Sequence, residues 1–350
     1  MVDEVKFGLI GSGFMGKLLA SAGDNIPACK LISLADPDEE TGKSFAREKE
    51  ASYYSDYFRM LEEEALDAVI VSTPEYLHRE PVVASAERGL DVFVEKPIAT
   101  NLEDADAIIQ AAGKEDVNVM VGYILRFEPA YASIKQAVEE GNAGNIISVY
   151  ARRNAPIQEA ERLNGRLNVV KYIGVHDFDQ ILWWHPSRPV TVRSRAVEGK
   201  VKEKLGTPDF VWTMIEFEDG SFAVVETGWG LPRNWSNWDS PKAWAGFGDV
   251  ELNVIGSEGV FSLDFTPMDV TGADSDGGWK LPDTRHWPAV DGEVTGAVKT
   301  EMERFFRSVH EGTSPPVSAK EARSSLELAL AAEKSIEEGR TIKLPLEGSS

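Results

Sequence analysis

Three glycines near the N-terminus have the spacing of a dinucleotide-binding loop. The segment Lys6–Gly16 reads KFGLIGSGFMG, an apolar strand that runs directly into G-x-G-x-x-G. In this motif the first glycine makes a tight turn, the second lets the backbone approach a pyrophosphate, and the third lets the helix pack on the strand. Free N–H groups at the start of the next helix then bind the phosphates. The motif predicts dinucleotide contacts from Gly11, Gly13, Phe14, Met15 and Gly16.

An acidic residue follows the next predicted strand, Leu31–Ala35. Asp36 lies 25 positions after Gly11 (36 − 11), close to the roughly 20 expected for a carboxylate that binds the adenosine ribose. Such a carboxylate accepts hydrogen bonds from the ribose hydroxyls and repels a 2′-phosphate. Residues 37–40 read PDEE and contain no arginine, so NAD is favoured over NADP. The alternative is that Asp36 is a solvated turn residue before Pro37.

A lysine stands at the end of a later predicted strand, in the run Val94-Glu95-Lys96-Pro97. An ammonium group there can donate to a substrate hydroxyl or stabilise a developing alkoxide. A cationic oxidised nicotinamide nearby would lower its pKa. Taken alone, Lys96 could equally be a surface residue in a turn. The glycine motif in the same chain favours the catalytic interpretation.

The first 122 residues alternate short apolar strands with helical patterns, which predicts a doubly wound parallel sheet. Ligands of such sheets bind beyond the C-terminal ends of the strands. Gly11, Asp36, Thr73 and Lys96 all fall at such ends. The predicted strands are Val5–Ile10, Leu31–Ala35, Ala68–Ser72, Val92–Glu95 and Val117–Gly122.

From Tyr123 onward the pattern changes to longer strand-like runs with hairpin signals, such as Asp219-Gly220. This predicts an antiparallel or mixed sheet with helices on one face. Two helices, Thr295–Glu311 and Ser318–Glu338, are expected to end the chain. The sequence therefore predicts an α/β protein of two domains, a dinucleotide-binding domain over 1–122 and a second domain over 123–350, for which the family resemblance given below implies substrate binding and oligomerisation.

Composition narrows the class of protein. The 350 residues are 42% hydrophobic and 27% charged, values typical of a globular protein, and no apolar run reaches the roughly 20 residues of a membrane span. The net charge of −22 argues against nucleic acid or anionic membranes as partners. Acids spread over the whole chain are typical of proteins from salt-loving organisms. No signal peptide is evident and Cys29 is the only cysteine, so we expect a cytoplasmic protein.

Four motifs together resemble the glucose–fructose oxidoreductase / inositol dehydrogenase (Gfo/Idh/MocA) family, and the similarity covers nearly the whole chain. They are the glycine motif, S-T-P-x-x-x-H at Ser72–His78, E-K-P at Glu95–Pro97 and GVHDFD at Gly174–Asp179. GYILRFEPAY (122–131) and ARRN (151–154) are most similar to inositol and related polyol dehydrogenases. The resemblance implies a Rossmann domain followed by an α/β domain with a large, mostly antiparallel sheet.

By this resemblance the chain is an NAD-dependent oxidoreductase acting on a secondary alcohol of a sugar, polyol or cyclitol. Family members also suggest a homodimer or homotetramer formed through the C-terminal sheet. The resemblance assigns catalysis to Lys96 and His176. It adds Thr73, Pro74, His78, Glu95 and Lys96 to the cofactor site. It implies a substrate site made of Lys96, Arg126, Asn154, Tyr172 and His176.

Histidine chemistry suits the role given to His176, since imidazole titrates near neutrality and can take the alcohol proton as hydride leaves. Asp179 and Gln180 lie three and four residues further on and could orient the ring from the same helix face. A histidine with only a packing role is the alternative.

One position departs from the family. Inositol dehydrogenases have an aspartate four residues before this histidine, and this chain has Tyr172. A carboxylate that binds a substrate hydroxyl is thus replaced by a bulky phenol. The change puts myo-inositol in doubt as the substrate, although Tyr172 could equally be a packed aromatic residue.

Several alternatives stay open. The enzyme could be a myo-inositol 2-dehydrogenase, or the chain could be a non-catalytic NAD-binding regulator, which the presence of both Lys96 and His176 disfavours. The tryptophan-rich stretch Trp229–Trp244 could bind sugar faces or another subunit. The histidines outside the site show no ligand spacing with carboxylates, so we expect no metal: His185, His286 and His310.

Overall fold

The computed structural model describes residues 4–233, 248–265 and 283–346 of the chain. Contacts divide it into two compact units, one of residues 1–127 and 285–323 and the other of residues 128–284 and 324–350. The sequence placed a single boundary after residue 122. The difference lies in the C-terminal segment, of which residues 285–323 belong to the first unit.

The first unit contains a six-stranded parallel sheet in the order β3-β2-β1-β4-β5-β6, which is the doubly wound order of dinucleotide-binding domains. β4 and β6 are buried at every position, as expected for strands covered on both faces. The strands are β1 (Val5–Ile10), β2 (Cys29–Ala35), β3 (Ser52–Tyr54), β4 (Ala68–Val71), β5 (Asp91–Glu95) and β6 (Val119–Gly122).

Helices connect these strands, and side-chain caps help to fix where they begin. Asp38 accepts hydrogen bonds from two backbone N–H groups at the start of α2, and Asn101 accepts one at the start of α5. The helices of this unit that follow the strands are α1 (Phe14–Asp24), α2 (Glu39–Glu48), α3 (Tyr57–Glu63), α4 (Arg79–Ala86) and α5 (Leu102–Glu115).

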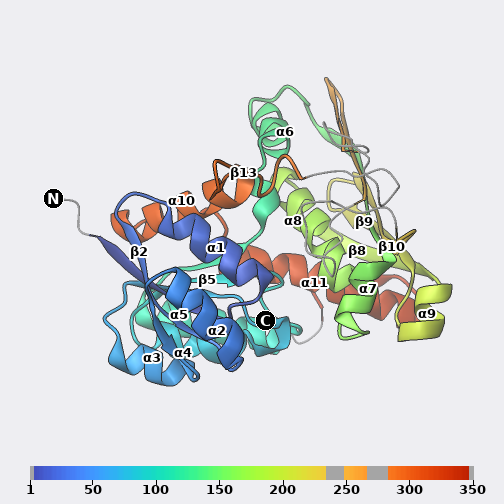
Figure 1. The fold of residues 1–350 in the computed structure, drawn as a ribbon. Helices are drawn as coiled ribbons and strands as arrows, with labels where there is room; N and C mark the ends of the chain where they lie inside the picture. Colours follow the sequence, from blue (N-terminus) through green and yellow to red (C-terminus); the bar gives the residue numbers. More distant parts are fainter. Residues whose placement is uncertain (1–3, 234–247, 266–282, 347–350) are drawn as a thin grey trace. The chain divides into compact units, whose positions relative to one another are not determined.

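The helix α10 (Gly296–Glu311) packs on the first unit although it comes late in the sequence. Its Phe306 ring lies 4.8 Å from that of Phe7, and its Phe305 ring lies 5.7 Å from that of Phe93. In Figure 1 the orange α10 runs beside the blue α1. The apolar face of α10 therefore completes the core of the parallel sheet, which explains the discontinuous unit.

The second unit is built on a seven-stranded sheet in the order β12-β11-β7-β10-β9-β8-β15. β7 and β10 pair in parallel, and the other neighbours are antiparallel, so the expected mixed, mostly antiparallel sheet is confirmed. The strands are β7 (Ile146–Pro156), β8 (Pro189–Val197), β9 (Phe210–Phe217), β10 (Phe222–Leu231), β11 (Asp249–Gly256), β12 (Val260–Asp264) and β15 (Ile342–Lys343).

Helices cover one face of this sheet. α7 (Ile157–Leu163) and α8 (Val175–Trp184) contact β7 and β10, and α6 (Pro129–Glu139) contacts α8. A π-helical turn, η3 (Val170–Gly174), leads into α8. On the other face, which we call the open face, alternate side chains of β9 are exposed, including those of Trp212 and Met214. Among the described helices, none is long and apolar enough to cross a membrane.

Candidate active site

The three glycines of the loop after β1 each meet a different steric demand. Gly11 has a φ of +92°, and a Cβ there would lie 2.7 Å from the carbonyl oxygen of Ser72. A Cβ on Gly16 would lie 2.0 Å from the carbonyl oxygen of Gly11, so only glycine lets α1 pack against the loop. Around Gly13, in contrast, no atom lies within 4 Å of a Cβ. The loop is thus tight on its protein side and open where a pyrophosphate would approach.

Asp36 lies at the end of β2 and is held by the glycine loop. Its Oδ2 accepts hydrogen bonds from the backbone N–H and the hydroxyl of Ser12, at 2.6 and 2.8 Å. Its Oδ1 accepts from the backbone N–H of Asp38 at 2.8 Å. The carboxylate is therefore fixed beside the loop, where it can meet a ribose. Ser12 occupies a variable position of the motif, so the spacing gave no signal for it.

His78 connects the loop after β4 to the loop after β5 through hydrogen bonds of its ring. Its ring nitrogens lie 2.9 Å from the carbonyl oxygen of Pro97 and 3.0 Å from that of Thr73. Burial lowers the pKa of the His78 ring, although the two carbonyls act in the opposite direction. His78 thus positions the loop after β4 (Thr73 and Pro74) against the one that carries Lys96. A direct contact between His78 and the cofactor stays a prediction.

Glu95 ends β5, and Lys96 follows it, half-buried at the edge of the sheet that also carries Gly11 and Asp36. Burial raises the pKa of the Glu95 carboxyl from 4.5 to about 7, while Lys96 acts to lower it. Glu301 of α10 is only 1% exposed, and burial, followed by the Glu95 charge, raises the pKa of its carboxyl well above the usual value. Glu301 therefore lies close enough to Glu95, the neighbour of the proposed catalytic lysine, for the two charges to interact, and the sequence gave no sign that α10 contributes an acid here.

Arg126 is buried in the first unit and bound to its own chain. Its Nη1 donates to Glu321 Oε1 at 2.7 Å and to the Pro316 carbonyl oxygen at 3.3 Å. These contacts tie the segment after β6 to the start of α11 (Ala319–Glu338). A contact between Arg126 and the substrate stays a prediction.

In the second unit, a buried ion pair joins β7 to α8. The guanidinium of Arg153, 1% exposed, donates to both carboxylate oxygens of Asp177 at 2.9 to 3.2 Å and to the Tyr131 hydroxyl at 2.6 Å. Burial raises the pKa of Asp177, although Arg153 lowers it. The pair anchors the helical turn that carries His176, so Arg153 has a structural task that the ARRN motif did not reveal.

His176 lies in the first turn of α8 and is 3% exposed. Of the two residues expected to orient it, Asp179 is fully buried and lies 3.5 Å from the Ser325 hydroxyl. Gln180 is 1% exposed, and neither atom of its amide forms a hydrogen bond within the described parts of the chain. Gln180 therefore does not orient the histidine ring through a hydrogen bond here.

Tyr172 lies in the π-helical turn, four residues before His176, and is half-buried. Its hydroxyl accepts a hydrogen bond from the Arg162 Nη2, and the guanidinium lies 5.4 Å from the centre of its ring. Arg162 in turn donates to Glu159 at 2.8 Å. Tyr172 is thus part of a polar cluster with α7, and no spacing rule connects Arg162 to it.

Asn154 and Arg153 are consecutive in β7, so their side chains lie on opposite faces of the sheet. The amide of Asn154 donates to Glu226 at 2.9 Å and to Asp249 at 3.3 Å. It therefore lies on the open face, opposite the face that α7 and α8 cover. Its role in substrate binding stays a prediction.

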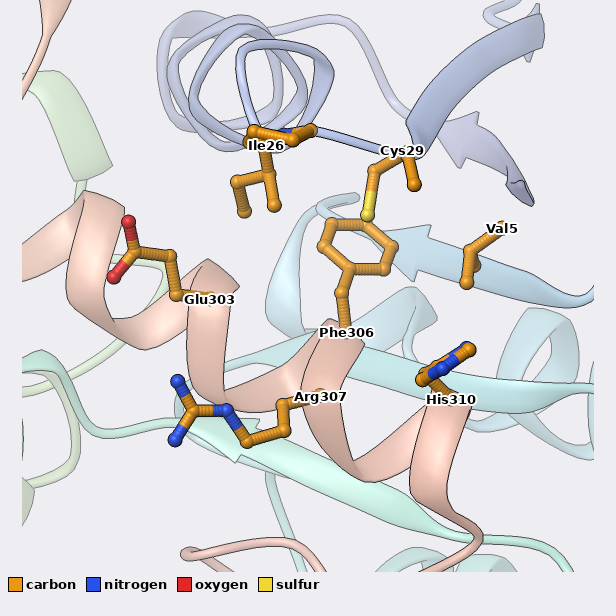
Figure 2. A pocket seen from close by; sticks show the side chains of 9 residues that line it. Val5, Ile26, Cys29, Glu303, Phe306, Arg307 and His310 are labelled. Carbon is orange, nitrogen blue, oxygen red and sulfur yellow. The ribbon is translucent and has the colours of Figure 1, made fainter. Parts of the chain in front are cut away.

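A cavity lined by Cys29 lies apart from these strand ends. The cavity, of about 360 Å³, opens where β1 and β2 begin, at the edge of the sheet opposite the glycine loop. Figure 2 shows the Cys29 thiol directed toward the Phe306 ring, with Arg307 and His310 on the same helix. Burial, and then Glu4, raises the pKa of this thiol to about 11, so it is a poor nucleophile at neutral pH.

The described residues contain no group of three or more His, Cys, Asp or Glu side chains suited to a metal ion. Trp229, the first residue of the tryptophan-rich stretch, is buried in β10 and donates to the Pro208 carbonyl oxygen at 2.7 Å, so its ring is not exposed for a sugar or another subunit. Trp235, Trp238 and Trp244 lie outside the described residues.

Comparisons with known proteins agree with this geometry. Residues 5–123 match the model of an oxidoreductase family with an NAD-binding Rossmann fold, and residues 131–262 match the C-terminal domain of the Gfo/Idh/MocA family. The chain belongs to the Gfo/Idh/MocA family of oxidoreductases. It is an oxidoreductase with an NAD-binding Rossmann fold, as the resemblance in its motifs predicted.

Individual relatives cover the chain to different extents. The scyllo-inositol 2-dehydrogenase (NAD(+)) of Bacillus subtilis is 27% identical over 98% of this chain and 97% of its own length. The 2,7-anhydro-N-acetylneuraminate hydratase of Escherichia coli is 30% identical over 66% of this chain and 63% of its own. The structure of scyllo-inositol dehydrogenase from Lactobacillus casei with bound NAD(H) and scyllo-inositol has a TM-score of 0.80 at 19% identity, covering 97% of this chain and 99% of that chain.

The residues at the strand ends of the first unit fit NAD. The open space at Gly13 admits a pyrophosphate, the fixed Asp36 carboxylate can accept from ribose hydroxyls, and the first turn of α1 offers its free N–H groups. The hydroxyl of Thr73 is buried without a hydrogen-bond partner in the described parts of the chain. A dinucleotide at this edge would provide one.

Proposed function

We propose that the enzyme oxidises a secondary alcohol of a sugar, polyol or cyclitol, or reduces the corresponding ketone. The observation that carries this proposal is the presence, in one chain, of a lysine at a strand end of the dinucleotide sheet and a buried histidine in the first turn of α8. Lys96 supplies a positive charge for a developing alkoxide, and His176 supplies an imidazole as the base.

The chain's residues divide the reaction between them. NAD, held by the glycine loop and Asp36, would supply the acceptor for the hydride of the substrate carbon. Lys96 donates a hydrogen bond to the substrate oxygen, which lowers the cost of negative charge there as the O–H proton leaves. His176 takes that proton, so that one hydride and one proton leave the alcohol and a ketone remains.

A panel of aldoses, polyols, inositols and sugar acids tests this proposal by the absorbance of NADH. We expect Lys96→Ala and His176→Ala each to lower turnover by about 10²-fold or more while NAD still binds. The double variant should lose much less than the sum of the two barriers, because both residues act in one constellation. Lys114→Ala and His310→Ala, which change exposed residues, are the matched controls. Activity within a few-fold of wild type in either single variant removes that residue from its role.

The same panel of substrates distinguishes two alternative functions from the proposed one. The scyllo-inositol relative favours an inositol 2-dehydrogenase, and Tyr172 opposes a myo-inositol 2-dehydrogenase because it replaces a hydroxyl-binding carboxylate. A non-catalytic NAD-binding regulator would turn over no substrate at all.

The open face of the C-terminal sheet supports a homodimer or homotetramer. Its exposed apolar side chains are unusual for a surface and suit contact with a second copy: Trp212, Met214, Ile255 and Val260. Light scattering should give a mass of at least twice 38.5 kDa for the wild type, and Trp212→Arg should lower it. A monomeric wild type contradicts this assignment.

The net charge of −22 supports adaptation to high salt in a cytoplasmic enzyme. Surface carboxylates repel each other, and molar KCl screens that repulsion. We expect the melting temperature to rise between dilute buffer and molar KCl. A flat or falling melting temperature contradicts the halophilic interpretation.

A further inference from the structure

A buried histidine of the first unit, His78, has hydrogen-bond acceptors on both sides of its ring. The residue is 1% exposed, and its Nδ1 lies 2.9 Å from the Pro97 carbonyl oxygen and its Nε2 3.0 Å from the Thr73 carbonyl oxygen. A neutral imidazole has one N–H donor and one acceptor nitrogen, whereas an imidazolium donates from both nitrogens. Only the protonated ring can therefore donate to both carbonyls.

The charges around this ring act on its second proton in both directions. Burial, the largest effect, lowers the pKa of the ring, whereas the backbone carbonyls and then Glu75, in the 3-10 turn η1 (Glu75–Leu77), raise it. In α4, Arg79 is paired with Asp104 of α5 at 2.8 Å, so these two charges balance each other. Lys96, in the loop after β5, carries a positive charge that opposes a second one. Hydrogen bonding and the Glu75 charge thus favour the imidazolium, and burial opposes it.

Packing connects the two carbonyls to the proposed cofactor and catalytic residues. A Cβ on Gly11 would lie 2.7 Å from the Ser72 carbonyl oxygen and 3.0 Å from the Thr73 nitrogen. The backbone of the loop after β4 therefore lies directly against the glycine loop, and a shift at Thr73 is transmitted to it. On the other side of the ring, Pro97 directly follows Lys96. The histidine thus stands between the glycine loop and the proposed catalytic lysine.

We propose that His78 is a positioning residue that acts as a proton-dependent clamp: as an imidazolium it holds the loops after β4 and β5 together, and as a neutral ring it leaves one carbonyl without a donor. This inference rests on the proposed function, because the clamped loops border the glycine loop and carry Lys96. If the clamped form binds NAD best, the affinity for NAD falls as pH rises through the titration of His78. Binding of NAD at lower pH is then accompanied by uptake of a proton on the ring.

Nuclear magnetic resonance of the protein–NAD complex counts the protons on the ring directly. The chain has five histidines, so selective ¹⁵N labelling of histidine gives few ring signals. An imidazolium shows two one-bond N–H correlations and a neutral ring shows one. We expect two correlations from His78 at about pH 6 and one at about pH 8.5. His78→Gln identifies these signals by their loss, and His310→Gln, which changes an exposed histidine, should leave them in place.

Calorimetric titration with NAD tests the effect of the clamp on the cofactor site. The glutamine of His78→Gln offers an N–H donor and an oxygen acceptor but does not titrate, so it imitates the neutral ring. We expect the Kd of this variant to exceed that of the wild type by about fivefold or more at about pH 6, and the two values to converge at about pH 8.5. The ratio of the two Kd values cancels titrations that both proteins share, including that of Glu95. His310→Gln should follow the wild type at both pH values.

Two results overturn the inference. One is a single N–H correlation from His78 at both pH values in the NAD complex. The other is a ratio of Kd values that stays the same between the two pH values. If thermal melting shows that His78→Gln does not fold, the first result decides, with the His78 signals identified by elimination through single variants of His176, His185, His286 and His310. Absence of turnover with every alcohol contradicts the proposed function instead, because neither measurement depends on turnover.

Discussion

The two regions that carry the predicted site residues are built by different means. At the strand ends of the parallel sheet, backbone geometry shapes the site, since Gly11 and Gly16 leave no room for a Cβ and Gly13 opens onto free space. On the covered face of the mixed sheet, charged side chains shape it. There Arg153 is bonded to Asp177 and Tyr131, and Arg162 to Glu159 and Tyr172.

This difference separates what each region can tolerate. The glycine loop is shaped by the backbone, and a substitution there disrupts it through a steric clash. A set of buried ion pairs can be altered one side chain at a time, and it fails through loss of charge balance. We therefore expect the first region to hold the cofactor and the second to be the place where substrate preference can vary.

The largest expected effect is on the buried ion pair. Arg153→Met leaves the Asp177 charge buried without its partner and should lower the free energy of unfolding by about 3–5 kcal/mol. Arg152→Met, one residue earlier, breaks more exposed pairs with Asp249 and Glu251 and should cost about 1 kcal/mol or less. Urea unfolding of both variants measures the difference. Equal losses would mean that burial does not distinguish the two arginines.

Substitutions in the glycine loop should distinguish an effect on stability from an effect on NAD binding. In Gly16→Ala the new Cβ meets the Gly11 carbonyl oxygen at 2.0 Å, so we expect a lower melting temperature and a loss of NAD affinity of about 100-fold, or ~2.7 kcal/mol. Gly13→Ala has space for its Cβ and should melt like the wild type, yet bind NAD more weakly because the methyl group faces the pyrophosphate. Calorimetric titration with NAD and thermal melting distinguish the two. A Gly16→Ala variant with unchanged stability contradicts the close packing.

Glu95 predicts an unusual dependence on pH. Burial raises the pKa of its carboxyl from 4.5 to about 7, so between these values the unfolded chain releases a proton that the folded chain keeps. The folded state therefore loses stability from this group as pH rises through that window. Glu95→Gln removes this effect. Between pH 5 and pH 8, the free energy of unfolding of this variant should therefore rise by about 2 kcal/mol relative to that of the wild type.

Urea unfolding at the two pH values measures this change, with Glu303→Gln on the exposed side of α10 as the control. If the difference between Glu95→Gln and wild type is the same at both values, Glu95 does not titrate in this window.

The smallest effect concerns the choice of cofactor. The Asp36 carboxylate, held by Ser12, should make NAD bind at least tenfold more tightly than NADP, or about 1.4 kcal/mol. Asp36→Ala should reduce the difference between the two affinities, mainly by weakening the binding of NAD. Titration with both cofactors measures it, and equal or tighter binding of NADP to the wild type would sink the assignment.

The sequence predicted the first region well because its determinants are local. The glycine spacing, Asp36 after the predicted strand 31–35 and Lys96 after the predicted strand 92–95 each follow from a few neighbouring residues, and the structure places all of them at one edge of one sheet. The mixed sheet was predicted from its hairpins for the same reason.

What could not be predicted depends on contacts between distant segments. The apolar stripe of α10 shows that the helix is amphipathic, but not which sheet it covers. The consecutive residues Arg153 and Asn154 of the ARRN motif lie on opposite faces of the sheet, because side chains alternate along a strand. Arg162 reaches Tyr172 because α7 and η3 both pack on β10, and that requires the assembled sheet.

The return of α10 to the first unit also sets an order of events during synthesis. Phe7 and Phe93 leave the ribosome early, while Phe306 and Phe305, which cover them, are made 299 (306 − 7) and 212 (305 − 93) residues later. The nascent dinucleotide-binding sheet must therefore wait with an uncovered apolar face while most of the second unit is translated. A fragment that ends at residue 127 would keep that face permanently open, so the domain that is easiest to recognise in the sequence is not one that can be excised by a single cut.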